Sequence, residues 1–269
     1  MGKIAQKHQK IGQKVPFWHK IELITALKEH MKNIFSKIAD SLFGDKYVCL
    51  CCKDERLFDD HNYLCDKCYN ALEFIKNACQ KCGDQVGPFD SYCDNCKKKE
   101  YKHSFDRAYC ICKYSGPAMS MVYSFKYGGN KYLCKVISKF MIDFFENVKD
   151  ELSIDLVVPV PLGEKRLKRR GFNQAQMLAE DIAKHFSFTL NATSVVRSKN
   201  TDTQTSMTRA ERLENVKGAF GITDKQQERG KNILLIDDIV TTGATCDEIS
   251  TILKRAGAKN VYVLAFCHA

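Results

Sequence analysis

The chain has 269 residues, of which 44% are hydrophobic, and a formal net charge of +10 at pH 7. This length and composition allow a sizeable core and two domains. No apolar run approaches the roughly 18 residues that a membrane-spanning helix needs, and the N-terminus lacks the compact apolar core of a signal peptide. We therefore expect a globular, cytoplasmic protein without a membrane span.

The first 46 residues hold half of the excess positive charge, with nine Lys against four acidic residues. Residues 1–30 are polar and basic, which predicts a disordered extension, and Met31 leaves open whether translation starts there. Residues 31–46 predict an amphipathic helix. Docking of this helix on the protein's own body is favoured over binding to a membrane or to nucleic acid. Its apolar face is formed by Ile34, Phe35, Ile38, Leu42 and Phe43.

Eight of the 14 cysteines form four C-x-x-C pairs within 48 residues. Two thiolates at this spacing in a tight turn can bind one tetrahedral Zn²⁺, and a second pair completes a closed structural site. The spacing therefore predicts a double zinc-ribbon domain over residues 47–100. The paired cysteines are Cys49/Cys52, Cys65/Cys68, Cys79/Cys82 and Cys93/Cys96.

The way in which these pairs combine is left open by the spacing. Sequential pairing is the simplest arrangement, and an interleaved, RING-like pairing is the alternative. Disulfides are disfavoured, because paired C-x-x-C motifs in a cytosolic chain indicate a metal. Cys51 lies inside the first pair and could replace Cys49 as a ligand. Two zinc sites with eight thiolates lower the formal net charge to about +6, which weakens the case for a strong nucleic-acid binder.

The most informative stretch is residues 233–245, ILLIDDIVTTGAT. Its four apolar residues predict a strand that is buried on both faces of a parallel sheet. Asp237 and Asp238 would then lie at the carboxyl end of this strand, where open α/β sheets bind their ligands. There the two carboxylates would accept hydrogen bonds from sugar hydroxyls or hold Mg²⁺ beside a diphosphate.

The hydroxyl-rich loop after the two acids predicts a phosphate site. Gly243 lets the backbone approach a ligand closely, and the following helix directs free N–H groups at an anion. A Walker-B strand or a dinucleotide-binding fold is disfavoured, because the chain contains neither G-x-x-x-x-G-K-S/T nor a G-x-G-x-x-G after a strand. The candidate phosphate ligands of this loop are Thr241, Thr242, Gly243, Ala244 and Thr245.

A second apolar strand, residues 154–158, ends at a Pro-Val-Pro sequence that cannot continue a ladder. Five cations follow between residues 165 and 170, and arginine offers a planar fork that suits phosphate. We expect Arg169 and Arg170 to bind phosphate there, although a run of charge is usually a solvated helix face. Lys126, just before a glycine pair, is a further phosphate candidate, with an ordinary solvated lysine as the alternative.

Helical and strand patterns alternate through the C-terminal part of the chain. By the handedness rule for crossover connections, this alternation predicts a right-handed parallel α/β sheet over residues 101–269. The expected helices are residues 116–125, 132–145 and 246–255, and the expected strands are residues 105–114, 154–158, 233–236 and 261–266.

The motif at residues 233–245 resembles the signature of the phosphoribosyltransferases that bind phosphoribosyl pyrophosphate. This resemblance implies an α/β fold with a type I phosphoribosyltransferase-like parallel sheet, joined to the N-terminal zinc-ribbon domain, in which four cysteines hold each metal. It also implies that the loop after residue 158 binds the pyrophosphate through its backbone, which adds Val160 and Pro161 to the expected site.

Residues 31–269 as a whole resemble the ComF family of competence proteins. The motifs that carry this resemblance are the double zinc module, VPVP, KRLKRRGFNQ, NTDTQT, RLENVKGAF and ILLIDDIVTTGAT. The resemblance implies a link to DNA uptake in natural transformation, together with a DNA-translocating helicase and recombination proteins. No feature of composition or spacing indicates DNA uptake by itself.

Two functions stay open at this point. The first is an enzyme that transfers phosphoribose from phosphoribosyl pyrophosphate with Mg²⁺ to an unknown acceptor, with Asp237 and Asp238 as the catalytic pair that orients the ribose. The second is a non-catalytic module that senses the same compound or a nucleotide while the zinc ribbons bind single-stranded DNA or a protein partner. The absence of a visible base-recognition motif keeps the second function open.

Overall fold

The computed structural model describes residues 47–56, 63–98, 102–198, 209–224 and 226–269. The expected extension at residues 1–30 and the expected helix at residues 31–46 lie outside these ranges. The chain divides into two compact units, Met1–Tyr47 and Val48–Ala269, and the second unit is described below.

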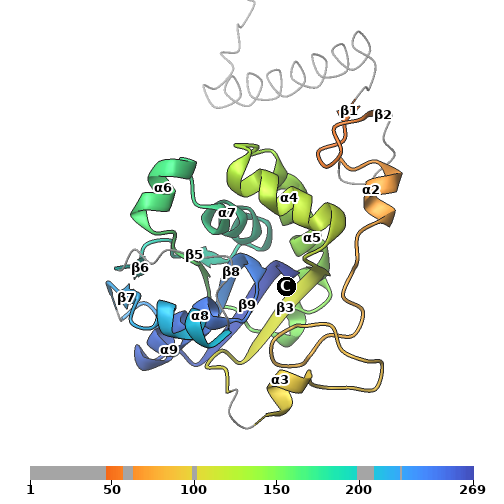
Figure 1. Cartoon of the computed structure of the whole chain (residues 1–269). Coiled ribbons are helices and arrows are strands. Elements are labelled where there is room, and N and C mark those ends of the chain that lie inside the picture. The colour runs from red at the N-terminus through yellow and green to blue at the C-terminus, as the bar shows by residue number, and fades with distance from the viewer. Residues whose placement is uncertain (1–46, 57–62, 99–101, 199–208, 225) are drawn as a thin grey trace, which may run out of the picture. The chain divides into compact units, whose positions relative to one another are not determined.

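A five-stranded parallel sheet forms the centre of this unit, with the strand order β3-β9-β8-β4-β5. Its parallel pairing confirms the α/β fold that the alternating pattern predicts. Figure 1 shows β8 and β9 in the middle of the sheet and β3 at one edge. The strands are β3 (Arg107–Lys113), β4 (Leu156–Pro159), β5 (Thr189–Leu190), β8 (Asn232–Val240) and β9 (Asn260–His268).

Helices cover both faces of the sheet and bury a hydrophobic core on each (Figure 1). Leu234 and Ile236 of β8 belong to one core, whereas Ile233 and Leu235 belong to the other, because successive side chains of a strand point to opposite faces. The apolar run at residues 233–236 is therefore buried on both sides. The first core includes α4 (Gly116–Tyr127), α5 (Leu133–Glu146) and α7 (Gln174–Phe186), and the second includes α9 (Ala244–Arg255).

Smaller elements surround the sheet. An antiparallel pair of short strands, β6 (Val195–Arg197) and β7 (Phe220–Ile222), lies apart from the main sheet. The remaining helices of this part are η1 (Lys149–Glu151), α6 (Glu164–Arg170) and α8 (Arg209–Val216). The cysteine-rich segment contains β1 (Tyr47–Val48), β2 (Glu55–Arg56), α2 (Asp66–Asn70) and α3 (Asp94–Lys97).

Residues 73–81 of the cysteine-rich segment run along the outer edge of β3. The N–H of Lys113 donates to Glu73 O at 2.9 Å, and the N–H of Ala108 donates to Lys81 O at 2.8 Å. Between them, the N–H of Ile75 donates to Ile111 O at 2.8 Å. An unpaired strand edge can pair with other chains, and this segment covers the edge of β3.

The central strand is longer than the sequence predicts. The sequence predicts a strand end before Asp237, but β8 continues to Val240, because β9 pairs with it as far as Val240 and His268. On the other side, β4 ends at Pro159, opposite Ile236. The two acids therefore follow the end of β4 while still lying within β8.

None of the helices in the described ranges has both the length and the apolar character that a membrane span needs.

Candidate functional site

A cavity of about 460 Å³ opens where β4 and β8 reach the carboxyl edge of the sheet. The residues around it come from α4, α6, α7, β6, α8, β8, α9 and the loops after β4 and β8. Its lining includes Tyr114, Lys126, Tyr127, Val160, Pro161, Leu162, Arg166, Arg170, Asn173, Gln174, Arg197, Asn215, Asp237, Asp238, Thr241, Thr242, Gly243, Ala244 and Thr245.

The two adjacent acids have different surroundings. The carboxylate of Asp238 is buried and lies 2.8 Å from Lys126 Nζ, whose side chain is only 18% exposed. Lys126 is therefore not the solvated lysine that the sequence allows. Burial disfavours the charge on Lys126, but attraction to Asp238 and Asp237 outweighs it and raises the pKa of the amine. The lysine stays protonated and neutralises Asp238.

Within the described ranges, no cation forms an ion pair with Asp237. Burial and the nearby charge of Asp238 raise the pKa of Asp237 to about 7, although Lys126 acts in the opposite direction. The Oδ1 atom of Asp237 accepts a hydrogen bond from the backbone N–H of Asp238 at 2.9 Å. A cation or a sugar hydroxyl at this edge would stabilise the ionised form, so the pair suits Mg²⁺ or a ribose.

The lining of the cavity also includes hydrogen-bond donors that have no partner among the residues that the structure describes. Arg170 Nε and Gln174 Nε2 are buried, and neither has a hydrogen-bond partner in the described part of the chain. Arg170 is held by a bond to Gln174 Oε1 at 2.9 Å, by the Tyr127 hydroxyl at 3.2 Å and by stacking 4.8 Å above the Tyr127 ring. Buried donors without partners are costly, so an anionic ligand that accepts from them is expected here.

The backbone of the loop after β4 is only partly available to a ligand. Val160 donates its N–H to Ile236 O at 2.9 Å, and its carbonyl accepts from Asn173 Nδ2 at 3.0 Å. Pro159 and Pro161 have no N–H to offer. Among the described residues, the N–H of Leu162 has no partner. Any backbone contact of this loop with an anion therefore comes from Leu162 onward, the last residue of the loop in which Val160 and Pro161 are also expected.

The loop after β8 bends sharply at Gly243, whose φ of 75° lies in the left-handed region. The Thr242 hydroxyl accepts a hydrogen bond from the N–H of Ala244 at 3.3 Å, and α9 begins at that residue. Gly243 and Ala244 are buried, while Thr241, Thr242 and Thr245 are partly exposed to the cavity. The loop thus presents hydroxyls and the start of a twelve-residue helix to one point, as a phosphate site requires.

Two further arginines enlarge the positive charge of the cavity. Arg197 of β6 and Arg166 of α6 both line it. Burial and repulsion from Arg166 lower the pKa of Arg197 to about 10, although Asp237 opposes this shift. With Lys126 and Arg170, four cations face two carboxylates, which favours a ligand with several negative charges.

The structure brings together nearly all of the phosphate and acid residues that the sequence predicts. The exception is Arg169, which is exposed and does not line the cavity, whereas its neighbour Arg170 does. Successive residues of a helix point about 100° apart, so only one of two adjacent arginines can face the same ligand. The assignment of Arg169 to the pocket is therefore not supported by its position.

Several lining residues have no assigned role in the sequence prediction. Tyr114 and Tyr127 come from segments that the sequence treats as ordinary structure, Arg197 opens a polar stretch without an assigned contact, and Asn215 enters only through the family resemblance. In the sequence, the one indication of these additional lining residues is that Tyr127 is adjacent to Lys126. The NTDTQT motif falls in residues 199–208 and lies outside the described residues.

The eight paired cysteines form two clusters of four, in the sequential pairing that the spacing favours. Within each cluster all four sulfur atoms lie within 4.8 Å of one another, and Cys52 Sγ to Cys65 Sγ is 3.7 Å. Four Zn–S bonds of about 2.3 Å in a tetrahedron place the sulfurs about 3.8 Å apart. The first cluster is Cys49, Cys52, Cys65 and Cys68, and the second is Cys79, Cys82, Cys93 and Cys96.

The thiols within each cluster differ in acidity. Burial alone would raise the pKa of Cys49, but N–H groups donated by the backbone, including that of Cys65 at 3.4 Å, lower it to about 7. The pKa of Cys79 is lowered to about 7 in the same way. In contrast, burial raises the pKa of Cys68 and of Cys82. The backbone donors therefore favour the thiolates of Cys49 and Cys79, and a Zn²⁺ ion in a cluster would be bound by all four cysteines as thiolates.

Cys51 does not belong to the first cluster. Its thiol points to the carbonyl of Pro117, at the start of α4, with a distance of 3.8 Å. All 14 cysteines are free thiols, which excludes the disulfide alternative in this structure. The donor set of both clusters fits a closed structural Zn²⁺ site.

Comparison with known proteins agrees with this architecture. The family described as "Phosphoribosyl transferase domain" matches residues 168–269, which contain the cavity residues from Arg170 onward. The fold and the site therefore define a protein with a phosphoribosyltransferase-type domain, preceded by two four-cysteine clusters that fit zinc ribbons.

The relatives extend this likeness over most of the chain. Competence protein ComFC of Streptococcus pneumoniae is 30% identical over 211 residues, which cover 76% of this chain and 87% of that protein. Competence protein F of Haemophilus influenzae is 28% identical and covers 77% of this chain and 98% of that protein. DNA utilization protein YhgH of Escherichia coli (strain K12) is 27% identical and covers 77% and 91%. The chain belongs to the ComF family of competence proteins.

Proposed function

We propose that the cavity binds phosphoribosyl pyrophosphate together with Mg²⁺. The observation that carries this proposal is the pairing, in one cavity, of the acids Asp237 and Asp238 with the unpartnered donors Arg170 Nε and Gln174 Nε2. A ligand that satisfies both sets of groups needs hydroxyls or a bound cation for the two acids and anionic oxygens for the two donors. A ribose that carries a diphosphate has this combination.

The proposed contacts divide among three parts of the site. Asp237 accepts hydrogen bonds from the ribose hydroxyls or holds Mg²⁺. Asp238 shares this role when its ion pair with Lys126 opens. Arg170 and Gln174 donate to the diphosphate. The loop at residues 241–245 holds the 5′-phosphate at the start of α9. Bound Mg²⁺ would neutralise charge on the diphosphate leaving group.

We propose phosphoribosyl transfer to an acceptor of unknown identity as the activity. The proposal is supported by the class of the domain and by the four cations, which suit a leaving diphosphate. The alternative is a sensing role, in which the same compound is bound and not turned over. Asn215 and Tyr114 at the cavity wall leave room for an acceptor but carry no pattern specific for one base.

Binding and turnover are tested separately. Calorimetry with phosphoribosyl pyrophosphate and Mg²⁺ should show one site per chain, and pyrophosphate release should then be measured with and without candidate acceptors. The Asp237→Asn variant should bind at least about tenfold more weakly, because a charge-assisted contact is worth roughly 1.5 to 3 kcal/mol. Equal affinity of the variant and the wild type would remove the ligand from this cavity. Binding without pyrophosphate release would favour sensing.

We further propose that the protein works in the cytoplasm in the handling of DNA during uptake, with single-stranded DNA and competence helicase or recombination proteins as partners. The names of the relatives support this role in DNA handling, and reduced cysteines fit a reducing compartment.

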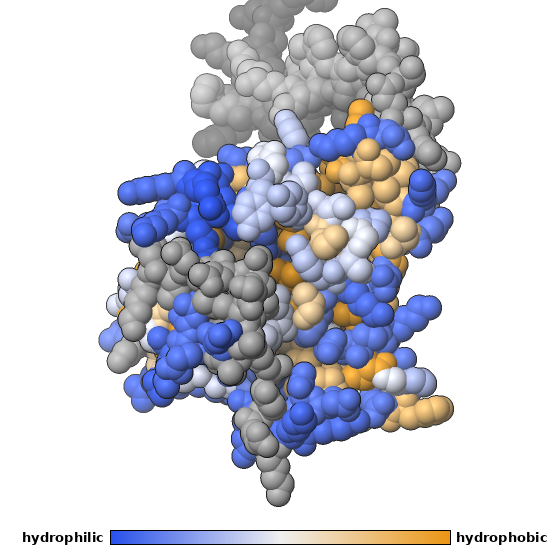
Figure 2. Space-filling model, in the orientation of Figure 1, coloured by the Kyte–Doolittle hydropathy of each residue, from blue (hydrophilic) through white to orange (hydrophobic). Residues whose placement is uncertain are grey.

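The exposed face of α6 offers cations for single-stranded DNA. Lys165, Lys168 and Arg169 are exposed there, and Figure 2 shows this part of the surface as strongly hydrophilic. Their replacement by Ala should weaken single-strand binding, measured by fluorescence anisotropy, and leave phosphoribosyl pyrophosphate affinity unchanged.

A further inference from the structure

The second cysteine cluster lies next to the loop that is proposed to hold phosphate. A second cavity, of about 260 Å³, is lined on one side by Cys82, Cys93 and Cys96 and on the other by Thr241 and Thr242. The same two threonines line the ligand cavity. The loop therefore separates the two cavities, with the cysteine cluster behind it.

His103 fills part of the space behind the loop. Its side chain is 6% exposed, its ring stacks on Phe105 with centroids 4.5 Å apart, and its Nδ1 atom lies 3.6 Å from Asp247 Oδ1 in the first turn of α9. A Cβ atom added to Gly243 would lie 3.1 Å from His103 Cε1. The imidazole is thus in close packing with the left-handed residue on which the bend of the loop depends.

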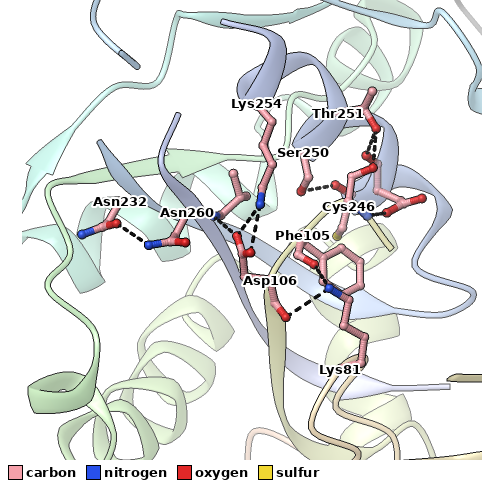
Figure 3. A network of polar contacts seen from close by, with 12 residues as sticks. Lys81, Phe105, Asp106, Asn232, Cys246, Ser250, Thr251, Lys254 and Asn260 are labelled. Atoms are coloured by element: carbon pink, nitrogen blue, oxygen red, sulfur yellow. Dashed lines mark hydrogen bonds and ion pairs between the residues drawn. The ribbon is translucent and has the colours of Figure 1, made fainter. Parts of the chain in front are cut away.

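The residues that follow His103 in the chain are bonded to the Cys79–Cys82 turn and to α9, and Figure 3 shows the contacts of Lys81, Asp106 and Lys254. Lys81 lies between Cys79 and Cys82, and its amine donates to the carbonyl oxygens of Phe105 and Asp106. The Asp106 carboxylate binds Lys254 of α9 at 2.8 Å. The Ser104 hydroxyl lies 2.7 Å from the Thr251 hydroxyl. These contacts tie the C-x-x-C turn, residues 103–106 and the helix after the phosphate loop into one network.

The Cys79–Cys82 turn also contacts the sheet directly. Gly83 approaches β3 so closely that an added Cβ would lie 2.8 Å from Ala108 O. Asp84 lies 3.4 Å from His268 Nδ1 at the end of β9. This part of the chain is therefore packed against β3 and the end of β9, and β9 pairs with β8, the strand that leads into the phosphate loop.

The first cluster has a different position. None of its four cysteines lines either of the two cavities. Its buried cysteines belong to the core that includes α4 and α5, and Cys51 beside it contacts Pro117 of α4. Within the described residues, the two clusters have the same ligand chemistry and different neighbours, so each serves as the control for the other.

We infer that the second cysteine cluster, through His103, holds the phosphate loop in its binding conformation, so that ligand affinity depends on the second cluster and not on the first. In this arrangement His103 is a positioning residue, which acts on the ligand through Gly243 and Asp247. The expected change in ligand affinity rests on the proposed function, whereas the structural support of residues 241–247 by the second cluster does not.

The first test compares one variant of each cluster in the full chain, Cys93→Ser and Cys52→Ser. Elemental analysis should show that each loses about one zinc ion. Hydrogen exchange of residues 241–247 should accelerate at least about tenfold in Cys93→Ser only, and the Kd for phosphoribosyl pyrophosphate with Mg²⁺ should rise by a similar factor, or about 1.4 kcal/mol. Unchanged exchange in Cys93→Ser, or an equal change in both variants, would overturn the inference.

A second test keeps both clusters intact, in case loss of a cluster unfolds the chain. His103→Ala should retain two zinc ions and show faster exchange at residues 241–247. His103→Phe should recover most of the protection, because it keeps an aromatic ring stacked on Phe105 and packed against Gly243. Identical exchange in the wild type and His103→Ala contradicts the positioning role. If the wild type binds no phosphoribosyl pyrophosphate and the exchange contrast persists, the proposed function fails and the support of the loop stands.

Discussion

Lys126 Nζ lies 2.8 Å from Asp238 Oδ1, and both side chains are largely buried. This pair divides the roles of two acids that the sequence treats as equivalent. Asp238 is paired with a cation of α4, whereas none of the described cations forms an ion pair with Asp237, and both acids line the ligand cavity. Asp238 therefore has a structural contact in addition to the ligand role that the sequence predicts for both acids.

Removal of Asp238 should destabilise the fold. In Asp238→Asn, Lys126 remains as a buried cation without its partner, which typically costs about 3 to 5 kcal/mol. Urea unfolding at pH 7.5 would measure this loss. The double variant Lys126→Met/Asp238→Asn removes both charges and should be more stable than the single one. A single variant as stable as the wild type would show that the pair has no structural role.

Asp237 should make the stability of the protein depend on pH. Its pKa is raised from 3.8 to about 7 by burial and by Asp238, so the folded protein retains a proton that the unfolded chain loses. Stability attributable to this group therefore falls as pH rises from about 4 through 7. Asp237→Asn should be more stable than the wild type at pH 8, with a difference that shrinks toward pH 4. Asp143→Asn, which removes an exposed carboxylate of α5 that pairs with Lys139, is the control, and the comparison isolates the effect of burial at Asp237.

Adjacent arginines of α6 should differ in their effect on binding. Arg170 lines the cavity and is held by Gln174 and Tyr127, whereas Arg169 is exposed. We expect Arg170→Ala to weaken binding of phosphoribosyl pyrophosphate at least about tenfold, measured by calorimetry, because a charge-assisted contact is lost. Arg169→Ala should bind like the wild type. Equal losses in the two variants would mean that the basic helix acts only through its total charge.

The metal content should be close to two zinc ions per chain. Each cluster places four sulfur atoms within 4.8 Å, which fits one tetrahedral ion. Cys51→Ser should retain both ions, because Cys51 contacts Pro117 and is not part of a cluster, while Cys49→Ser should lose one. Elemental analysis of protein purified without chelator is the measurement. Loss of an ion in Cys51→Ser would contradict the cluster assignment.

Local patterns predict the strands and helices well where one physical cause dominates. The apolar run before Asp237 predicts a buried strand, and the alternation of helices and strands predicts a parallel sheet, because burial on both faces leaves a continuous apolar signature. The end of that strand depends instead on how far β9 extends beside it. The length of β9 is determined outside residues 233–245, so no pattern within them predicts where β8 ends.

The site was predictable where its residues lie within one motif and not where they come from distant elements. The two acids and the loop at residues 241–245 are contiguous in the chain, whereas Arg197 reaches the cavity from β6 and Tyr127 from the last turn of α4. The face of α6 that turns inward is set by tertiary packing, which decides between Arg169 and Arg170. The contact between His103 and Gly243 likewise depends on a long-range approach that sequence spacing does not encode.

The covered edge of β3 has a consequence for the order in which the chain folds. The inner neighbour of β3 is β9, and Asp106 bonds with Val261, 155 residues later. A chain emerging from the ribosome has therefore completed both cysteine clusters and residues 73–81 long before β9 exists, and such distant pairing is slow. The cysteine-rich segment is the earliest native neighbour that β3 can acquire. Zinc supply during synthesis should thus govern how much of the newly made chain stays soluble, as well as how the finished protein works.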